Sequence, residues 1–305
     1  MKLAVLADIH SNLPALQAVL DHIDAWRPDA VVVAGDVVNR GPRPVECLEL
    51  VMQRVQREGW LLVRGNHEDY VLTHVVPDPS LRPIEREVYQ NSYWTYVALG
   101  VQVAGGLADW PLAVSLQAPD GSEVRVTHAS MRGNRDGIFP WTTDEVLREQ
   151  MGHPPALLFC VGHTHRPLAR TLDGRLIVNV GAAGLPFDGD PRASYGQFTW
   201  RHGDGQGGGG RQSTGRQGAD QQGAGQHGGW QAEIVRLDYD RTVAEADFAA
   251  SGFLDEGGPL SLLILEELRH ARSYIGEWVN AYWDAVMAGE VSIEESVRRF
   301  LAEVG

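Results

Sequence analysis

Four short segments of this chain combine carboxylate, amide and imidazole side chains, which are the groups that bind transition-metal ions in proteins. These side chains belong to Asp8, His10, Asp36, Asn66, His67, His163 and His165. Two divalent ions about 4 Å apart need an anion between them to offset their repulsion, and a carboxylate is the small bridging group that a protein can offer. Asp36, in the segment VVVAGDVVNRGPRP, is the natural bridge. The set predicts a dinuclear metal site.

The spacing within the segments lets neighbouring side chains share an ion. Asp8 and His10 are two residues apart, and the two histidines of GHTH have the same spacing. Asn66 adds a neutral carbonyl oxygen, and His128 follows a further apolar run and completes the set. For one such fragment alone, capping of a strand or helix is the better explanation. Four fragments in order, each after an apolar run, favour the metal site.

The apolar runs before these segments predict the strands that position them. Strands are predicted over residues 2–7, 31–36 and 60–63, with helices that begin at residues 11–14 and cover residues 45–57. This alternation is typical of a parallel α/β sheet. Ligands bind at the carboxyl ends of the strands in such a sheet, so the four segments are expected to meet there.

The later part of the chain predicts a second set of strands. Hairpins are expected where Pro-Asp-Gly separates residues 113–117 from 123–127 and where Asp-Gly separates residues 168–171 from 176–180. Further strands are predicted over residues 157–161, 194–200 and 233–238, and helices within residues 69–100 and over residues 144–151 and 291–304. The second strand of the first hairpin leads directly into His128.

Residues 201–229 differ from the rest because they are rich in Gly and Gln and contain no apolar residue beyond Ala. Such a segment cannot bury enough surface to offset the entropy lost on ordering. We therefore predict a disordered insertion in a hairpin loop, without a catalytic role. After Asp240 the pattern becomes helical, with an apolar stripe at residues 275, 278, 279, 282 and 286. Packing of this stripe on the α/β body is the preferred interpretation, and a dimer seam or a lid is the alternative.

Composition limits the class of protein. The chain has 305 residues, 43% of them hydrophobic, and a formal charge of −14, which argues against a partner such as long nucleic acid. Cys47 and Cys160 lie in a predicted helix and a predicted buried strand, where reduced thiols are expected. No apolar run approaches the length of a signal peptide core or a membrane span. These features predict a cytoplasmic protein that does not associate with membranes.

The ordered series Asp8-x-His10, Gly35-Asp36, Gly65-Asn66-His67-Glu68, Thr127-His128 and Gly162-His163-Thr164-His165 resembles the calcineurin-like metallophosphoesterase superfamily. The resemblance spans about residues 1–200. It implies an α/β fold, a four-layer sandwich of two mixed β-sheets flanked by helices. On this basis residues 1–250 are expected to form the metallophosphoesterase domain, and residues 251–305 a C-terminal helical extension packed on it.

The resemblance also implies a role for each site residue. One ion would be held by Asp8, His10 and His165, and the other by Asn66, His128 and His163. Asp36 would bridge the two ions, and His67 would donate a proton or bind phosphate. The implied reaction is attack on phosphorus by a metal-activated water. The expected cofactors are two divalent ions, manganese first, with iron, zinc, cobalt or nickel as alternatives.

Two branches of the superfamily share features with this chain. The segments GDVVNRGP and RGNHE resemble the Ser/Thr protein phosphatases and the diadenosine tetraphosphatases, and by that analogy Arg40 would hold the substrate phosphate. Asn39 departs from those enzymes, which have an aspartate there to orient the histidine. The segments GHTHRP and NVGAAGLPFDGDPRASY resemble the small bacterial phosphodiesterases over a longer stretch. Whether Arg40 binds substrate or is structural stays open.

The leading hypothesis is a phosphoesterase that hydrolyses small phosphodiesters, nucleotides or phosphomonoesters. A Ser/Thr-type protein phosphatase or a diadenosine tetraphosphatase is the alternative within the superfamily. A binding module that has lost catalysis is the alternative outside enzymes, and it predicts missing ligands. None of the seven metal ligands is missing, nor is His67. A homo-oligomer formed through the C-terminal helices is also left open.

Overall fold

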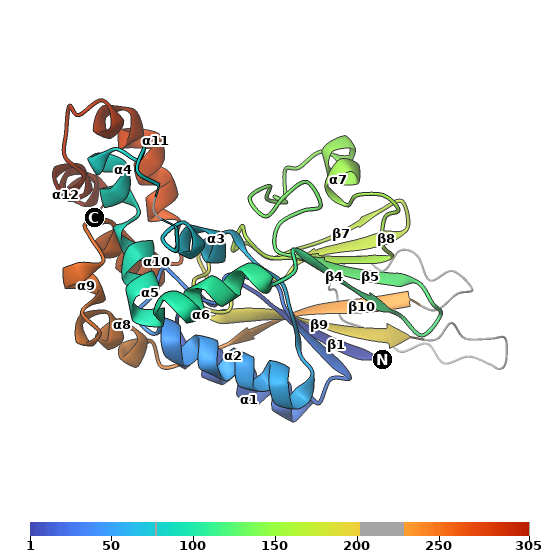
Figure 1. Cartoon of the computed structure of the whole chain (residues 1–305). Coiled ribbons are helices and arrows are strands. Elements are labelled where there is room, and N and C mark those ends of the chain that lie inside the picture. Colours follow the sequence, from blue (N-terminus) through green and yellow to red (C-terminus); the bar gives the residue numbers. More distant parts are fainter. Residues whose placement is uncertain (77, 202–228, 305) are drawn as a thin grey trace, which may run out of the picture.

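The computed structural model describes residues 1–76, 78–201 and 229–304, and it contains two five-stranded sheets (Figure 1). The first sheet, in the order β10-β9-β1-β2-β3, consists of β1 (Lys2–Leu6), β2 (Ala30–Val33), β3 (Leu61–Leu62), β9 (Ala193–Arg201) and β10 (Gly229–Leu237). The second, in the order β4-β5-β6-β8-β7, consists of β4 (Ala113–Gln117), β5 (Glu123–Thr127), β6 (Leu158–Val161), β7 (Leu168–Leu172) and β8 (Arg175–Asn179). Both sheets are mixed, because parallel strands at their centres have antiparallel neighbours.

The side chains of β1 point alternately to the two faces of the first sheet, and this alternation explains why both faces are covered. Ala4 and Leu6 point to one side of the first sheet, where they pack with apolar residues of helix α1 (Leu13–Trp26). Leu3 and Val5 point to the other side, where they pack with Val126 and other residues of the second sheet. Both faces of β1 are therefore buried, which is why its sequence is a continuous apolar run.

The outer face of the second sheet is covered in the same way. Leu147 and Met151, in and just after helix α7 (Asp144–Gln150), pack on Phe159 and Ile177. The order helices, sheet, sheet, helix gives the four-layer sandwich that the sequence predicted, so this prediction is confirmed. The remaining helices of this part are α2 (Pro44–Glu58), α3 (Asn66–Leu72), α4 (Pro83–Val88), α5 (Gln90–Leu99), α6 (Val101–Gly106) and the 3-10 helix η1 (Leu107–Asp109).

The strand predictions err at the ends of β2 and β3. The strand predicted to end at Asp36 leaves the sheet after Val33, and the one predicted over residues 60–63 pairs over two residues alone. Gly35 and Asp36 have φ angles of +87° and +55°, which a strand cannot include. The predicted insertion at residues 201–229 lies, apart from its two end residues, outside the described residues. Those end residues pair with each other, because β9 and β10 are antiparallel neighbours.

The C-terminal part is helical, as predicted. It consists of α8 (Arg241–Ala250), α9 (Phe253–Glu256), α10 (Leu260–His270), α11 (Tyr274–Met287) and α12 (Ile293–Val304). Trp278 and Val286 of the predicted stripe are buried, whereas Val279 is 37% exposed. Ile264 of α10 packs in one cluster with Phe187 of the α/β body, so these helices are anchored to it. The boundary at residues 250/251 stays a prediction.

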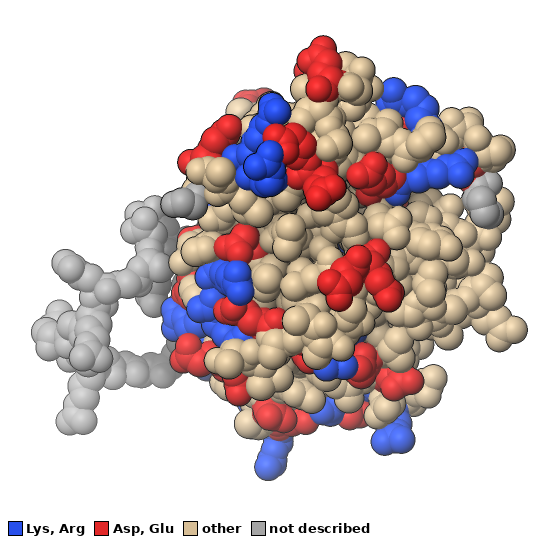
Figure 2. Space-filling model, turned by 90° about the vertical axis from the view of Figure 1, so that its left-hand side faces the viewer, with Lys and Arg blue, Asp and Glu red and all other residues tan. Residues whose placement is uncertain are grey.

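The surface over these helices shows no continuous area of one charge. On the face drawn in Figure 2, acidic and basic side chains are interspersed among uncharged ones. Within the described residues, no helix combines the length and the apolar character that crossing a bilayer requires. Cys47 and Cys160 are buried free thiols, as the sequence predicted.

Candidate metal centre

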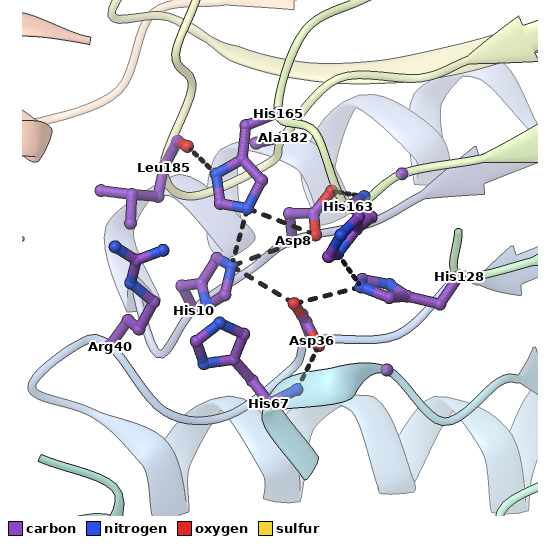
Figure 3. A network of polar contacts seen from close by, with 12 residues as sticks. Asp8, His10, Asp36, Arg40, His67, His128, His163, His165, Ala182 and Leu185 are labelled. Carbon is purple, nitrogen blue, oxygen red and sulfur yellow. Dashed lines mark hydrogen bonds and ion pairs between the residues drawn. The ribbon is translucent and has the colours of Figure 1, made fainter. Parts of the chain in front are cut away.

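The structure brings all eight predicted metal and catalytic residues together at the carboxyl ends of strands from both sheets. They lie in four loops and at the start of one helix: Asp8 and His10 after β1, Asp36 after β2, Asn66 and His67 at the start of α3, His128 after β5, and His163 and His165 after β6. The two sheets pack face to face, so the ends of their central strands meet and form one site (Figure 3). This convergence is what the βαβ order predicts.

The backbone of these loops is strained. Five of the residues have positive φ angles between +47° and +69°, namely Asp8, His10, Asp36, His163 and His165. A residue other than glycine pays about 1 kcal/mol or more for this conformation. Hydrogen bonds between the loops hold it, because the N–H of Asp8 donates to the carbonyl of Gly35 and the N–H of His10 to that of Asp36. Strain of this kind is typical of functional sites.

The first group of ligand atoms surrounds Asp8. His10 Nε2 lies 3.1 Å from His165 Nε2, and His165 Nε2 lies 3.5 Å from Asp8 Oδ1. Asp36 Oδ2 is 3.7 Å from His10 Nε2 (Figure 3). The four side chains offer ligand atoms that all lie within 4.8 Å of one another, and all four are buried. This arrangement could hold one metal ion.

The second group shares Asp36 with the first. Asp36 Oδ2 lies 3.2 Å from His128 Nε2, and His128 Nε2 lies 3.2 Å from His163 Nδ1. The amide oxygen of Asn66 is 2.9 Å from each of those two imidazole nitrogens. One oxygen of Asp36 therefore faces both groups, which is the position that a bridging ligand needs.

Two buried carboxylate oxygens have no hydrogen-bond partner within the described part of the chain, and they test whether the residues fit a metal. They are Asp8 Oδ1 and Asp36 Oδ2, both at the centre of the ligand groups. The second oxygen of each carboxylate is satisfied, because Asp8 Oδ2 accepts the N–H of His163 and Asp36 Oδ1 that of His67. A buried carboxylate oxygen without a partner is costly, and a cation would remove that cost. The residues fit a divalent metal pair.

The outer nitrogens of three imidazoles fix which nitrogen faces the site. Nδ1 of His10, His128 and His165 each contacts a backbone carbonyl, of Asn39, Ala34 and Leu185 respectively. A carbonyl can accept but not donate, so each Nδ1 carries a hydrogen, and each ring in its neutral form presents the lone pair of Nε2 inward. Lone pairs that face one another are the arrangement expected of metal ligands.

Two glycines allow the carboxylates to reach these positions. A Cβ atom on Gly65 would lie 2.0 Å from Asp36 Oδ1, and one on Gly162 would lie 2.6 Å from Asp8 Oδ2. Any side chain at these positions would displace a ligand. The glycines of RGNHE and GHTH are therefore steric requirements of the site.

Glu68 organises the loop that presents the bridge, a role that the sequence analysis did not assign to it. Its buried carboxylate accepts the N–H groups of Gly65, Asp36 and Val37 at 2.8–2.9 Å. Burial and the nearby charge of Asp36 raise the pKa of Glu68 to about 7. The sequence signal for Glu68 was its position at the end of RGNHE, directly after the predicted site residues Asn66 and His67.

Charge in the metal-free site is concentrated on one ion pair. Burial opposes ionisation of Asp36, but the charge of His128 and its contact with the carboxylate hold the pKa of Asp36 well below the ordinary value. Burial likewise disfavours the charged form of His128, yet Asp36 and Asp8 raise its pKa to about 10. The pKa values of His10 and His165 are lowered, first by burial. His128 therefore holds a proton that a metal ion would have to displace.

His67 lies beside the bridge and contacts Asn39. Its Nδ1 is 3.0 Å from Asn39 Nδ2, while Asn39 Oδ1 accepts the N–H of Arg40 at 2.8 Å. The asparagine amide therefore donates to Nδ1, and the ring hydrogen of His67 is on Nε2. Burial, together with the positive charge of Arg40, lowers the pKa of His67 well below its ordinary value. His67 is thus a neutral hydrogen-bond donor.

Arg40 is fixed by a residue from the C-terminal helices. Its Nη2 lies 2.7 Å from Glu267 Oε2 on α10, and that carboxylate is fully buried. Glu267 Oε1 accepts the N–H of Ile275 at the start of α11. Burial raises the pKa of Glu267, and the charge of Arg40 opposes this shift. Sequence reasoning missed Glu267, because nothing in the sequence connects residues 227 positions apart.

A cavity of about 360 Å³ opens onto these residues. Its lining includes Asp36, Asn66, His67, His163 and His165 at the candidate metal centre, with Arg40 beside them. The other lining residues, none of which was among the predicted site residues, are Phe139, Trp141, Thr164, Arg166, Phe187, Ser273, Ile275 and Gly276. One wall of the cavity therefore comes from the turn into α11, in the C-terminal helices.

A protein-family model matches the part of the chain that contains this site. The model of the family described as calcineurin-like phosphoesterase matches residues 1–167, more than half of the chain. That range contains every residue of the two ligand groups.

Individual relatives cover a larger share of the chain. The uncharacterized protein MJ0912 of Methanocaldococcus jannaschii is 30% identical over 216 residues, which are 63% of this chain and 80% of that protein. The phosphodiesterase YfcE of Escherichia coli K12 is 26% identical over 204 residues, 64% of this chain and 86% of its own. The crystal structure of a metallophosphoesterase from Sphaerobacter thermophilus is similar with a TM-score of 0.60 and 28% identity, covering 89% of this chain and 99% of that one.

Proposed function

Because the chain belongs to the calcineurin-like phosphoesterase family, we propose that it is a metal-dependent hydrolase of small phosphoesters, with phosphodiesters preferred to monoesters. The observation that supports this most directly is the pair of buried carboxylate oxygens without donors, surrounded by imidazole and amide acceptors. The name of the Escherichia coli relative supports the preference for diesters.

In this proposal the two ligand groups hold one divalent ion each. The first ion would be bound by Asp8, His10 and His165, and the second by Asn66, His128 and His163, with Asp36 between them. The mixed oxygen and nitrogen donors suit manganese, iron, cobalt, nickel or zinc, and manganese is our first choice. Bound there, such a pair of ions would lower the pKa of a water molecule and supply positive charge to the reacting phosphoryl group.

The chain's own side chains then have distinct tasks. His67 directs its Nε2–H away from Asn39, so it can donate to a phosphoryl or leaving oxygen in the cavity. Arg40 offers the N–H groups of its guanidinium to the substrate phosphate. Because its Nη2 is paired with Glu267, the orientation of the guanidinium is set before substrate binds. Glu68 keeps Asp36 in its strained position through its hydrogen bonds to the loop.

The cavity favours a small substrate over a phosphorylated protein. The wall formed by Ser273, Ile275 and Gly276 closes one side of it, and its volume of about 360 Å³ is in the range of small-molecule sites. A protein phosphatase is therefore our second choice, and a diadenosine tetraphosphatase is the other alternative within the superfamily. A binding module without activity is disfavoured because every expected ligand residue is present.

A paired assay on metal-reconstituted protein tests the proposal. Turnover of bis-p-nitrophenyl phosphate and of p-nitrophenyl phosphate would be compared with manganese and with a chelator. We expect chelator-sensitive turnover that favours the diester. A preference for the monoester would support the phosphatase alternative. Absence of turnover with manganese, iron, cobalt, nickel and zinc, in protein that binds these ions, would support the binding module.

The cytoplasmic location and an oligomer formed through the C-terminal helices stay predictions.

A further inference from the structure

Two aromatic rings form part of the cavity and have no role in the proposed chemistry. Phe139 and Trp141 line it, and their rings are stacked with centroids 4.9 Å apart and an interplanar angle of 15°. Trp141 is 69% exposed, so the part of its indole ring that Phe139 does not cover is available to a ligand. We call these two residues the aromatic wall. A single exposed aromatic residue is ordinary, but a stacked pair in the lining of a catalytic cavity is not.

The loop that contains the aromatic wall is held against the metal ligands. A Cβ atom on Gly137 would lie 2.7 Å from Thr164 and 3.1 Å from His163, so this loop contacts the GHTH segment at that point. The N–H of Phe139 donates to Thr142 Oγ1, and the N–H of Thr142 returns a bond to the carbonyl of Phe139, both at 3.0 Å. The aromatic wall is therefore organised before a ligand binds.

The two arginines of the cavity differ in their partners. Arg40 is paired with the buried carboxylate of Glu267. Arg166, which directly follows His165, is half-buried in the same lining, and within the described part of the chain no carboxylate lies within 4.0 Å of it. A partly buried guanidinium without a counter-ion is ready to bind an anion, and phosphate matches its geometry.

From these observations we propose that the cavity is a nucleotide site, in which the aromatic wall stacks on the nucleobase and Arg166 binds a phosphoryl oxygen. The substrate class is then a nucleoside phosphoester. Every nucleobase has a flat face that stacks on an indole ring, and such stacking changes affinity by roughly tenfold per base. The inference rests on the proposed function for the scissile phosphate, but the nucleobase subsite can be tested separately.

The test compares two diesters with the same leaving group and the same charge. One is the p-nitrophenyl ester of thymidine 5′-phosphate, and the other is methyl p-nitrophenyl phosphate. Only the first has a base to stack. With manganese-loaded protein we expect kcat/KM to be about tenfold higher for the thymidine ester, mainly through a lower KM. Equal values for the two esters would overturn the inference.

Variants test whether the aromatic wall causes the preference for the thymidine ester. Trp141→Ala should reduce kcat/KM for the thymidine ester about tenfold, to the level of the methyl ester, and leave the methyl ester within twofold. Trp141→Phe should retain most of the preference, because a phenyl ring can still stack. Leu262→Ala is the matched control, since Leu262 is 44% exposed and lines a separate hollow between the C-terminal helices. A Trp141→Ala variant that loses activity equally on both esters would contradict the subsite.

A binding measurement separates this inference from the proposed function. Calorimetry with the manganese-loaded protein would compare thymidine 5′-monophosphate with methyl phosphate. We expect thymidine monophosphate to bind about tenfold more tightly, and Trp141→Ala and Arg166→Gln each to weaken it. If no ester is hydrolysed but this difference is found, the proposed hydrolysis is wrong and the nucleotide site stands. Equal binding of the two ligands would overturn the nucleotide site even in an active enzyme.

Discussion

The candidate metal centre and the cavity beside it are built by different means. The metal centre consists of buried or half-buried polar side chains from the α/β body, and backbone groups hold five of them, namely Asp8, His10, Asp36, His128 and His165. The cavity wall is assembled from a loop after β5 and the C-terminal helices, and it includes exposed Trp141. The first region is suited to holding ions, and the second to selecting what reaches them. Substitutions in the two regions should therefore leave different kinetic signatures.

The largest effect is expected at the bridge. Asp36→Asn removes the one charge that faces both ligand groups, so metal content and turnover should fall together, with kcat/KM reduced on the order of a thousandfold. Metal analysis measures the metal content, and the diester assay measures turnover. Asp173→Asn is the control, because Asp173 is an exposed carboxylate paired with Arg148. A variant with two bound ions and normal turnover would refute the assignment of the bridge.

The same contrast explains how much the sequence could predict. Asp8, Asp36 and His128 each follow an apolar run, and the topology of a parallel sheet brings strand ends to one edge whatever the side-chain packing. The resemblance to a known family added their individual roles. Phe139, Trp141 and Glu267 could not be found in this way. Their positions depend on how a loop and two helices pack, and that packing is set by many small apolar contacts without a local pattern.

Protonation of His128 makes metal binding dependent on pH. Its pKa of about 10 means that the metal-free protein holds this proton at neutral pH, and an ion in the second ligand group has to release it. The affinity for that ion should therefore rise with pH, about tenfold per unit and about a hundredfold from pH 6.5 to 8.5.

Calorimetry in buffers of different ionisation enthalpy measures the released proton. We expect at least one proton per protein, and the cavity variant Trp141→Ala should release the same number as the unmodified chain. Binding without proton release would show that His128 is not a ligand.

Effects in the cavity should be smaller and should spare the metals. Glu267→Gln removes the charge that orients Arg40, so KM should rise about tenfold while metal content is unchanged. Arg40→Ala should have a similar effect, and the double variant should be little worse than either, because the two residues act through one contact. Glu267→Asp keeps the charge and should restore part of the loss. Additive losses would show that Glu267 acts independently of Arg40.

The smallest effect is expected where the two regions meet, at Asn39. Asn39→Asp keeps the shape of the side chain, and one oxygen can still accept the N–H of Arg40. The other oxygen of the new carboxylate stands where the amide N–H group donated to His67 Nδ1, so an acceptor replaces a donor. This favours the imidazolium form and should raise the lowered pKa of His67.

A protonated His67 can donate to a poor leaving group, so turnover of alkyl esters should improve a few-fold, whereas p-nitrophenyl esters, whose leaving group needs no proton, should be unchanged. The gain should disappear as pH rises through the new pKa, and His67→Ala should abolish it. An equal change for both kinds of ester would show that Asn39 controls the position of His67 and not its proton.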